Sequence, residues 1–383
     1  MIKNKLLSFI LSVCIIASSF VIGTSAVPNE TKMNFDCKSA ILIEAKTGKV
    51  LFEQNADEAL PPASVTKIMT LLIVMEAIEE GKLSLDDTVT ASAHACSMGG
   101  SQIYLEEGEQ MSVEDMLKSV IIASANDAAV ALAEHIAGTE EAFVEIMNKR
   151  AKELGMINTN FENTNGLDDT AENHVTSARD IAIMSSALLS HKKITEYSSI
   201  WMDTIRNGEF GLTNTNRLVR FYKGANGLKT GSTSKAMFCI SASAERNGMT
   251  LICVIMAAPT RDIRNSAATA LLDWGFANYS VFSKLEDSIS QIKVSAGVKR
   301  SCKIDVSEFN TVLGKNSKNE IKSEIDLPEK ISAPVKKGDK IGKVNYYLGE
   351  DLIGSVDIRS AENIERINFR QLLARFFAKI SLV

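Results

Sequence analysis

The pattern of apolar and polar residues divides the chain into a first region that mixes strands with helices and a second region of short strands. Residues 39–54 predict a β-hairpin, because the stretches SAILIE and KVLFEQ flank a turn at 46–48. A second hairpin is predicted where AMFCISASAE and MTLICVIMAA flank Arg246-Asn247-Gly248. The strands therefore come from both ends of the first region.

Helices are expected between these two hairpins. Apolar residues recur at helical spacing over residues 68–80, and a last helix is expected over 270–279. Four further helices are predicted from Ser112 to about 123, over 126–136, from Thr139 to Gly155 and from Thr176 to about 191. This order predicts an α/β (α+β) domain in which helices cover a sheet and an all-helical insert is added.

The second region begins after about Ser283, where short alternating stretches such as QIKVSA and KIGKVNYYL are separated by Gly, Lys and Asp. They predict a small all-β domain over residues 284–360. In residues 361–383, apolar residues recur at helical spacing, four cations lie among them, and no acid follows Glu365. We expect an amphipathic helix that lies on the outer face of the cytoplasmic membrane. A helix packed on the β domain is the alternative.

The N-terminal residues 1–26 have the features of a secretory signal peptide. Lys3 and Lys5 precede an apolar stretch, and Thr24-Ser25-Ala26 supplies small residues for cleavage after Ala26. The protein is therefore expected to be exported, with residues 27–283 as its first domain. An uncleaved membrane anchor is the alternative, but the serines in the apolar stretch and the small-residue ending favour cleavage.

The net charge bears on which partners are expected, and the spacing of the cysteines bears on whether disulfides are expected. Without residues 1–26 the formal net charge is −7, with 40 Lys and Arg against 47 Asp and Glu, so nothing favours nucleic acid as a partner. The five cysteines that remain are scattered and contain no CxxC pair. We interpret them as buried free thiols rather than a disulfide framework.

The candidate chemistry begins with Ser64 and Lys67 in the stretch PPASVTKIMT. Three residues apart on a helix, the two side chains share a face, and the helix N-terminus brings N–H groups close to Ser64. A serine hydroxyl needs a base. A lysine can be that base if its pKa falls by about 3 from the reference value of about 10.4, which burial and a second cation would cause.

Other catalytic arrangements have little support. None of the four histidines lies in a setting that suggests a Ser-His-Asp triad, and no His/Cys/Asp cluster has the spacing of a metal site. We therefore expect neither a metal nor another cofactor.

Two further triplets support the interpretation of Ser64 and Lys67 as a nucleophile and its base. Ser124-Ala125-Asn126 lies at the junction of two predicted helices, and Lys229-Thr230-Gly231 is predicted to start a strand. An SxxK pair, an SDN-type triplet and KTG form the signature of penicillin-binding proteins and class A β-lactamases.

Each residue of these triplets suits one task. Ser124 can relay a proton, and Asn126 can hold the amide of the substrate. Lys229 supplies the second cation, while the hydroxyls of Thr230 and Ser232 can bind a carboxylate. Gly231 lets the backbone of the substrate lie flat against the strand.

On these motifs the chain resembles the serine D-alanyl-D-alanine carboxypeptidases, the low-molecular-mass penicillin-binding proteins. Segments such as GGSQIYLEEGEQMSVEDML, SANDAAVALAEHIAG, TNGLDD and NGLKTG follow the family order. The resemblance is strong from Cys37 to Tyr279 and weaker in the β domain. Ala125 and Ser177 depart from the residues usual in the family, and neither departure removes a functional group.

This resemblance implies a penicillin-binding, β-lactamase-like fold and an acyl transfer reaction. Ser64 would attack the bond between two D-alanines of a peptidoglycan stem peptide, and water would release the shortened stem. A β-lactam would acylate the same serine. The N–H groups of Ser64 and Ser232 would form the oxyanion hole. Arg261 or Arg264 would help bind the terminal carboxylate, unless they form structural ion pairs.

Two other functions compete with this one. A β-lactamase shares the motifs and adds a glutamate that activates water, a role for which Glu162 lies at a suitable distance along the chain. TNGLDD and the β domain favour the carboxypeptidases instead. A wall-binding protein without catalysis is the other alternative, but a pure binder has no need of a nucleophile beside a base.

Overall fold

A five-stranded antiparallel sheet forms the centre of the first domain. The computed structural model describes residues 33–168 and 171–380, so the predicted signal peptide lies outside it. In spatial order the strands are β2 (Val50–Gln54), β1 (Ser39–Glu44), β9 (Met249–Ala258), β8 (Met237–Arg246) and β7 (Ala225–Thr233). Both predicted hairpins are confirmed. The central strand β9 is almost wholly buried, which explains its unbroken apolar sequence.

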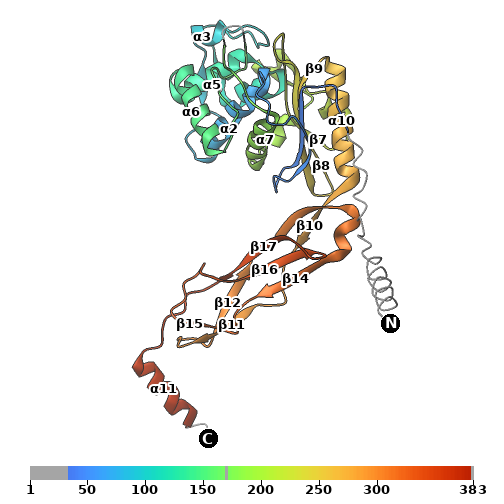
Figure 1. Ribbon diagram of the computed structural model, residues 1–383. Helices are drawn as coiled ribbons and strands as arrows, with labels where there is room; N and C mark the ends of the chain where they lie inside the picture. The colour runs from blue at the N-terminus through green and yellow to red at the C-terminus, as the bar shows by residue number, and fades with distance from the viewer. Residues whose placement is uncertain (1–32, 169–170, 381–383) are drawn as a thin grey trace, which may run out of the picture. The chain divides into compact units, whose positions relative to one another are not determined.

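Helices cover both faces of this sheet. In Figure 1, α10 (Arg261–Asn278) lies on one side of the sheet, while α2 (Lys67–Glu79) and α7 (Ala178–Ser190) lie on the other. Ten of the 13 residues of α2 are buried, including Lys67. A helix that is apolar around its circumference is stable only when other elements surround it, and α2 lies at the core of the domain.

The predicted helical insert is present, and capping side chains define its helices. It contains α3 (Ala93–Cys96), α4 (Val113–Lys118), α5 (Asn126–Ala137) and α6 (Glu140–Glu153), with a short hairpin of β3 (Thr88–Thr90) and β4 (Gln110–Ser112). The side chains of Ser112 and Thr139 accept hydrogen bonds from the first turns of α4 and α6, as predicted. A π-helical turn over Ser119–Ala123 connects α4 to the turn before α5.

Several predicted boundaries were wrong. Helix α10 begins at Arg261, not at 270, because Thr260 caps it and the apolar pattern is sparse in its first half. Ser177 caps α7 in place of Thr176. Strand β7 begins at Ala225, so Lys229 lies at its middle. The patterns also missed a hairpin of β5 (Met202–Ile205) and β6 (Phe210–Thr213) and the short helices α8 (Ile194–Ser198) and α9 (Leu218–Phe221).

The second region is β-rich, as predicted. A six-stranded sheet has the order β14 (Ile321–Asp326), β16 (Lys340–Leu348), β17 (Asp351–Ser360), β12 (Ser301–Val306), β11 (Gln291–Ser295) and β15 (Lys330–Ser332). A separate pair is formed by β10 (Tyr279–Lys284) and β13 (Phe309–Gly314). The rings of Phe309 and Tyr346 stack at 4.1 Å between centroids in a hydrophobic cluster of this region.

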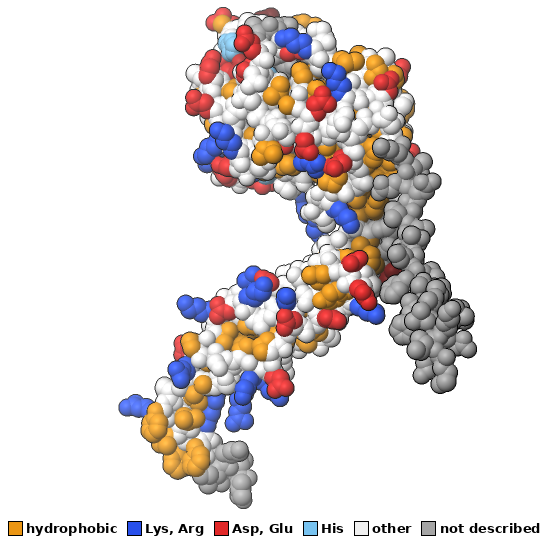
Figure 2. Space-filling view, viewed as in Figure 1, with side chains coloured by type: hydrophobic (Ala, Val, Ile, Leu, Met, Phe, Trp, Pro, Cys, Tyr) orange, Lys and Arg blue, Asp and Glu red, His pale blue; other side chains and the backbone are white. Residues whose placement is uncertain are grey.

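The C-terminal helix α11 (Phe369–Ile380) is present where the periodicity predicts it. Five of its large apolar side chains are exposed, those of Phe369, Leu372, Leu373, Phe376 and Phe377. Of these, Leu372 is 54% and Phe376 62% accessible to solvent. Figure 2 shows hydrophobic side chains gathered over this helix beside Lys and Arg. Within the described part of the chain, no helix is both long and apolar enough to cross a bilayer.

All five cysteines of the described residues are free thiols. Cys239, Cys253 and Cys302 are buried, as predicted, whereas Cys37 and Cys96 are only half-buried.

Candidate active site

Ser64 lies in a 3₁₀ turn (Ala63–Thr66) that leads directly into α2. The sequence predicted the start of an α-helix here, so the local geometry is tighter than expected. Ala63 has a φ of 49°, and Gly166 packs against its carbonyl. A Cβ at Gly166 would lie only 1.9 Å from the oxygen of Ala63. Glycine is therefore required at 166 for the turn that contains Ser64 to keep this position.

The side chain of Lys67 points from α2 towards Ser64 and has no solvent exposure. Its Nζ lies 2.9 Å from Ser64 Oγ, 2.5 Å from Asn126 Oδ1 and 2.8 Å from the backbone oxygen of Asn165. Burial lowers the pKa of Lys67 well below its usual value, and the charge of Lys229 lowers it further. The nearby charge of Asp127 opposes this shift and is the smaller effect.

These contacts suit a neutral amine. A neutral amine has two N–H groups and one lone pair, and two of its three neighbours are carbonyl-type oxygens that can only accept. If Asn126 and Asn165 take the two N–H groups, the lone pair remains for the hydroxyl proton of Ser64.

The predicted triplet at 124–126 reaches this pair through Asn126, whose Oδ1 contacts Lys67. Ser124 ends the π-helical turn with a left-handed φ of 64° and is 96% buried. Asn126 is the first residue of α5, and two hydrogen bonds to the 99–101 loop hold it: its Nδ2 donates to Gly99 O and its N–H to Ser101 O. Asn126 is thus fixed before it contacts Lys67.

Strand β7 packs against the turn that contains Ser64. It is an edge strand, so one side of its backbone has no strand partner among the described residues. A Cβ at Gly231 would lie 2.8 Å from Ser64 N and 2.9 Å from Pro62 O, which explains the glycine of the KTG triplet. Ser232 is exposed beside it. The strand therefore runs directly past Ser64.

Lys229 is almost completely buried, and its Nζ donates to Thr230 O at 3.1 Å. Burial, with a smaller effect from the charge of Arg264, lowers the pKa of Lys229 to about 7. The side chain of Thr230 donates to Thr215 Oγ1 at 2.8 Å. Thr215 is exposed and lies between β6 and α9, so it adds a second hydroxyl to the wall of the site.

The two candidate arginines lie in the first turn of α10 in different environments. Arg264 is 97% buried and donates to Cys239 O and to the side chain of Asn265. Cys239 is the β8 partner of Gly231, so Arg264 supports the sheet behind the KTG triplet. Arg261 is exposed. Neither forms an ion pair within the ranges 33–168 and 171–380.

Sequence reasoning missed three residues that contact or perturb the predicted ones: Asp127, Asn165 and Thr215. Asp127 directly follows Asn126, and its carboxylate accepts hydrogen bonds from Ile103 N and Leu105 N. Thr215 and Asn165 lie in the stretches TNTN and TNGLDD. Asn165 contributes a backbone oxygen, which no side-chain motif can reveal.

The glutamate considered for a β-lactamase is engaged elsewhere. The carboxylate of Glu162 is exposed and accepts hydrogen bonds from Glu172 N and Asn173 N. Glu162 therefore stabilises the backbone at residues 172–173.

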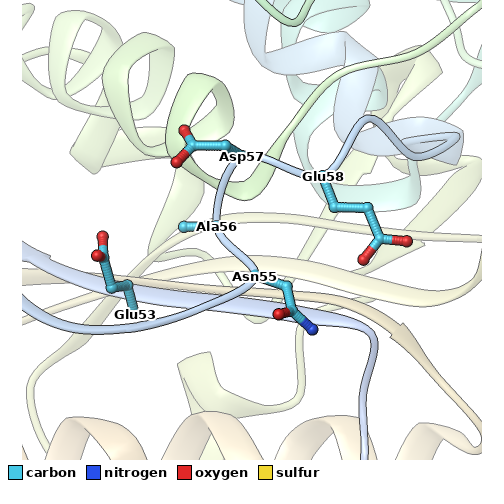
Figure 3. A pocket seen from close by; sticks show the side chains of 5 residues that line it. All are labelled: Glu53, Asn55, Ala56, Asp57 and Glu58. Carbon is cyan, nitrogen blue, oxygen red and sulfur yellow. The ribbon is translucent and has the colours of Figure 1, made fainter.

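An acidic pocket is separate from the predicted site. Figure 3 shows it lined by Glu53, Asn55, Ala56, Asp57 and Glu58. It borders β2, the edge strand opposite β7. Arg179 forms ion pairs with Glu53 and Asp57, which gives these acids a structural explanation. Within the described ranges, no group of three or more His, Cys, Asp or Glu side chains is arranged to hold a metal.

Comparison with known proteins gives matches over most of the chain. Residues 25–260 match the model of the D-alanyl-D-alanine carboxypeptidase family, and residues 276–366 match that of the penicillin-binding protein 5 C-terminal domain. The chain is 42% identical over 352 residues to D-alanyl-D-alanine carboxypeptidase DacF of Bacillus subtilis, covering 90% of each chain.

Solved structures show the same similarity. Penicillin-binding protein 5 from Haemophilus influenzae has a TM-score of 0.78 and 35% identity, over 88% of this chain and 99% of its own. Penicillin-binding protein D2 from Listeria monocytogenes, in its ampicillin-bound form, has a TM-score of 0.59 and 32% identity, over 64% of this chain and 99% of its own.

The effect of Lys229 on the pKa of Lys67 gives a prediction that can be tested without a substrate. Lys229→Ala raises the pKa of Lys67, because it removes the positive charge that lowers this pKa most after burial. An NMR titration of the lysine side chains measures the midpoint. Lys223→Ala, which removes an exposed lysine just before the same strand, leaves that midpoint unchanged. An identical Lys67 midpoint in Lys229→Ala and the intact protein would contradict the coupling.

Proposed function

Because this chain belongs to the D-alanyl-D-alanine carboxypeptidase family, we propose that it removes the terminal D-alanine from peptidoglycan stem peptides through an acyl-enzyme on Ser64. The observation that carries the proposal is the 2.9 Å contact between Ser64 Oγ and the buried amine of Lys67. It supplies a nucleophile and a base in one place without a cofactor.

Acylation starts with a proton transfer. Lys67 accepts the hydroxyl proton of Ser64 as Oγ attacks the carbonyl of the penultimate D-alanine. The N–H groups of Ser64 and Ser232 stabilise the oxyanion of the tetrahedral intermediate. Ser124 relays the proton from Lys67 to the leaving nitrogen, and D-alanine departs. Water then attacks the ester on Ser64, with Lys67 again as the base, and releases the shortened stem.

Substrate binding uses the free edge of β7. A stem peptide that adds to this edge as a strand places its scissile carbonyl beside Ser64. Asn126 holds a substrate amide, and Gly231 lets the substrate backbone approach. The hydroxyls of Thr230 and Ser232 and the charge of Lys229 bind the terminal carboxylate. Arg261, which is exposed, can add to this site. Arg264 binds the backbone of β8 next to Gly231, and its charge helps to lower the pKa of Lys229.

The competing functions have less support. The carboxylate of Glu162 is engaged with backbone N–H groups of a turn, so it is a poor candidate for a deacylating base. A purely wall-binding protein would not require a lysine buried beside the serine at the cost of a strongly lowered pKa. We therefore expect β-lactams to act as inhibitors that acylate Ser64 and leave slowly.

We propose four segments for the chain. Residues 1–26 are a signal peptide, 27–283 the peptidase domain, 284–360 a small β domain and 361–383 a membrane-associating segment. The protein is exported and attached peripherally to the outer face of the cytoplasmic membrane. The exposed apolar residues of α11 and the cations among them support this attachment.

The proposed reaction is tested with a peptide that ends in D-Ala-D-Ala. The intact protein releases D-alanine from it but not from the same peptide with an amidated C-terminus, because the terminal carboxylate is required. Mass spectrometry after incubation with penicillin shows one adduct on the peptide that contains Ser64, and chelators change neither result.

Ser64→Ala is the matched variant, since it removes only the hydroxyl oxygen. It loses both D-alanine release and the adduct. Release of D-alanine by Ser64→Ala at the rate of the intact enzyme would refute the mechanism.

Membrane attachment is tested with a protein that lacks residues 369–383. This truncation spares Ile364, which is buried in the β domain. The truncated protein remains in the supernatant when membranes are sedimented, while the intact protein is recovered with them. Equal penicillin acylation of both proteins serves as the control for folding. Sedimentation of the truncated protein with membranes as fully as the intact one would rule out α11 as the attachment.

A further inference from the structure

Two sets of hydrogen bonds, joined by the peptide bond between Thr164 and Asn165, connect the surface to the amine of Lys67. They use groups that the mechanism above does not assign. The inner end of this connection is the backbone oxygen of Asn165, which lies 2.8 Å from Lys67 Nζ. This oxygen takes one of the two N–H groups of the neutral amine. Its position therefore decides whether the lone pair points at the hydroxyl of Ser64.

The preceding residue, Thr164, is fully buried and held from two sides. Its carbonyl accepts a hydrogen bond from Thr70 Oγ1 at 2.6 Å, one turn beyond Lys67 on α2. On the other side, its N–H and its hydroxyl both donate to Glu140 Oε1, at 2.9 and 2.7 Å. The carboxylate of Glu140 thus fixes both the backbone and the side chain of Thr164.

Glu140 is itself oriented by His94. Its Oε2 lies 2.8 Å from His94 Nε2, and only 11% of the side chain of Glu140 is exposed, against 48% for His94. The hydrogen bond to Glu140 raises the pKa of His94, and the charges of Glu134 and Glu141 act in the same direction. Two helices of the insert, α3 and α6, therefore converge on the Thr164–Asn165 segment.

We propose that Glu140, oriented by His94, is a positioning residue for the Ser64–Lys67 pair: it holds Thr164 so that the Asn165 carbonyl occupies one N–H of Lys67 and leaves the lone pair for Ser64. The proposal rests on the proposed function, because it assigns a task only if Lys67 is the base for Ser64. Glu140 reaches the reacting atoms only through Thr164 and Asn165, so it acts on the rate of acylation and not on substrate binding.

The test compares Glu140→Ala with Glu141→Ala. Both remove a glutamate from the first turn of α6, but Glu141 is exposed, and Thr164 is bound to Glu140. For Glu140→Ala we expect kcat on a D-Ala-D-Ala peptide, and the rate of penicillin acylation, to fall by roughly 10- to 100-fold, as misplacement of a reacting group does. We expect KM to stay within about twofold, because the carboxylate site at Thr230 is not touched. Glu141→Ala behaves like the intact enzyme.

Two further variants separate positioning from folding stability. Glu140→Gln keeps an oxygen that can accept from Thr164 and recovers most of the lost rate. Thr164→Val removes only the hydroxyl donor and lowers kcat by up to about tenfold. In a protein that already carries Glu140→Ala, Thr164→Val lowers kcat almost no further, because both substitutions break the same contact. If Glu140→Ala does not fold, Thr164→Val and Glu140→Gln still test the proposal.

The outcomes are distinct. A wild-type rate of acylation in Glu140→Ala, or fully additive losses in Glu140→Ala and Thr164→Val, would overturn the proposal. So would a lowered melting temperature with unchanged kcat, which identifies a purely structural role. All three results leave the proposed function intact, because the unmodified enzyme is still acylated at Ser64. Absence of acylation in the unmodified enzyme itself would instead overturn the proposed function.

Discussion

The buried amine of Lys67 is the constraint on which the rest of the site depends. A charged ammonium without water is costly, and no ion pair to Lys67 or Lys229 occurs among the residues that the structure describes. The second lysine adds repulsion to the cost of burial. Both effects lower the pKa of Lys67 and act against its charged form, which is what the proposed role of Lys67 as the base for Ser64 requires.

The fold provides what this amine requires. Helix α2 is surrounded by other elements, so its lysine cannot reach water. The helical insert brings Asn126 to the amine, and the segment between α6 and α7 brings the Asn165 carbonyl. The edge strand β7 brings the charge of Lys229 close enough to act on Lys67. Gly231 and Gly166 permit close contact of β7 and of the 164–167 segment with the turn of Ser64. Ser64 thus lies where helices and sheet meet.

The sequence predicted the parts of this arrangement that are local. Ser64 and Lys67 are three residues apart, so helical geometry alone brings them together, and the caps at Ser112 and Thr139 follow from their own side chains. Contact between the three motifs could not be derived from spacing and was inferred from a family resemblance. Strand and helix boundaries near polar residues were less accurate, as the early start of α10 at Arg261 shows.

Other features had no signal in the pattern of side chains. The Asn165 contact uses a backbone oxygen, and the bond between Thr215 and Thr230 joins a loop to a strand through two common hydroxyls. Glu140 looked like an ordinary acid in the first turn of a helix, where acids are common. Only the folded chain shows that its carboxylate meets Thr164.

The most direct test of the account is the rate at which penicillin acylates Ser64 when Lys67 is replaced. Lys67→Ala removes the proposed base, and Lys67→Arg keeps a cation that cannot be deprotonated in a protein. The account predicts that both variants fold and that neither is acylated at a measurable fraction of the rate of the intact enzyme. Acylation of Lys67→Arg at the intact rate would show that only a positive charge is needed there, and an unchanged rate in Lys67→Ala would remove this lysine from the reaction altogether.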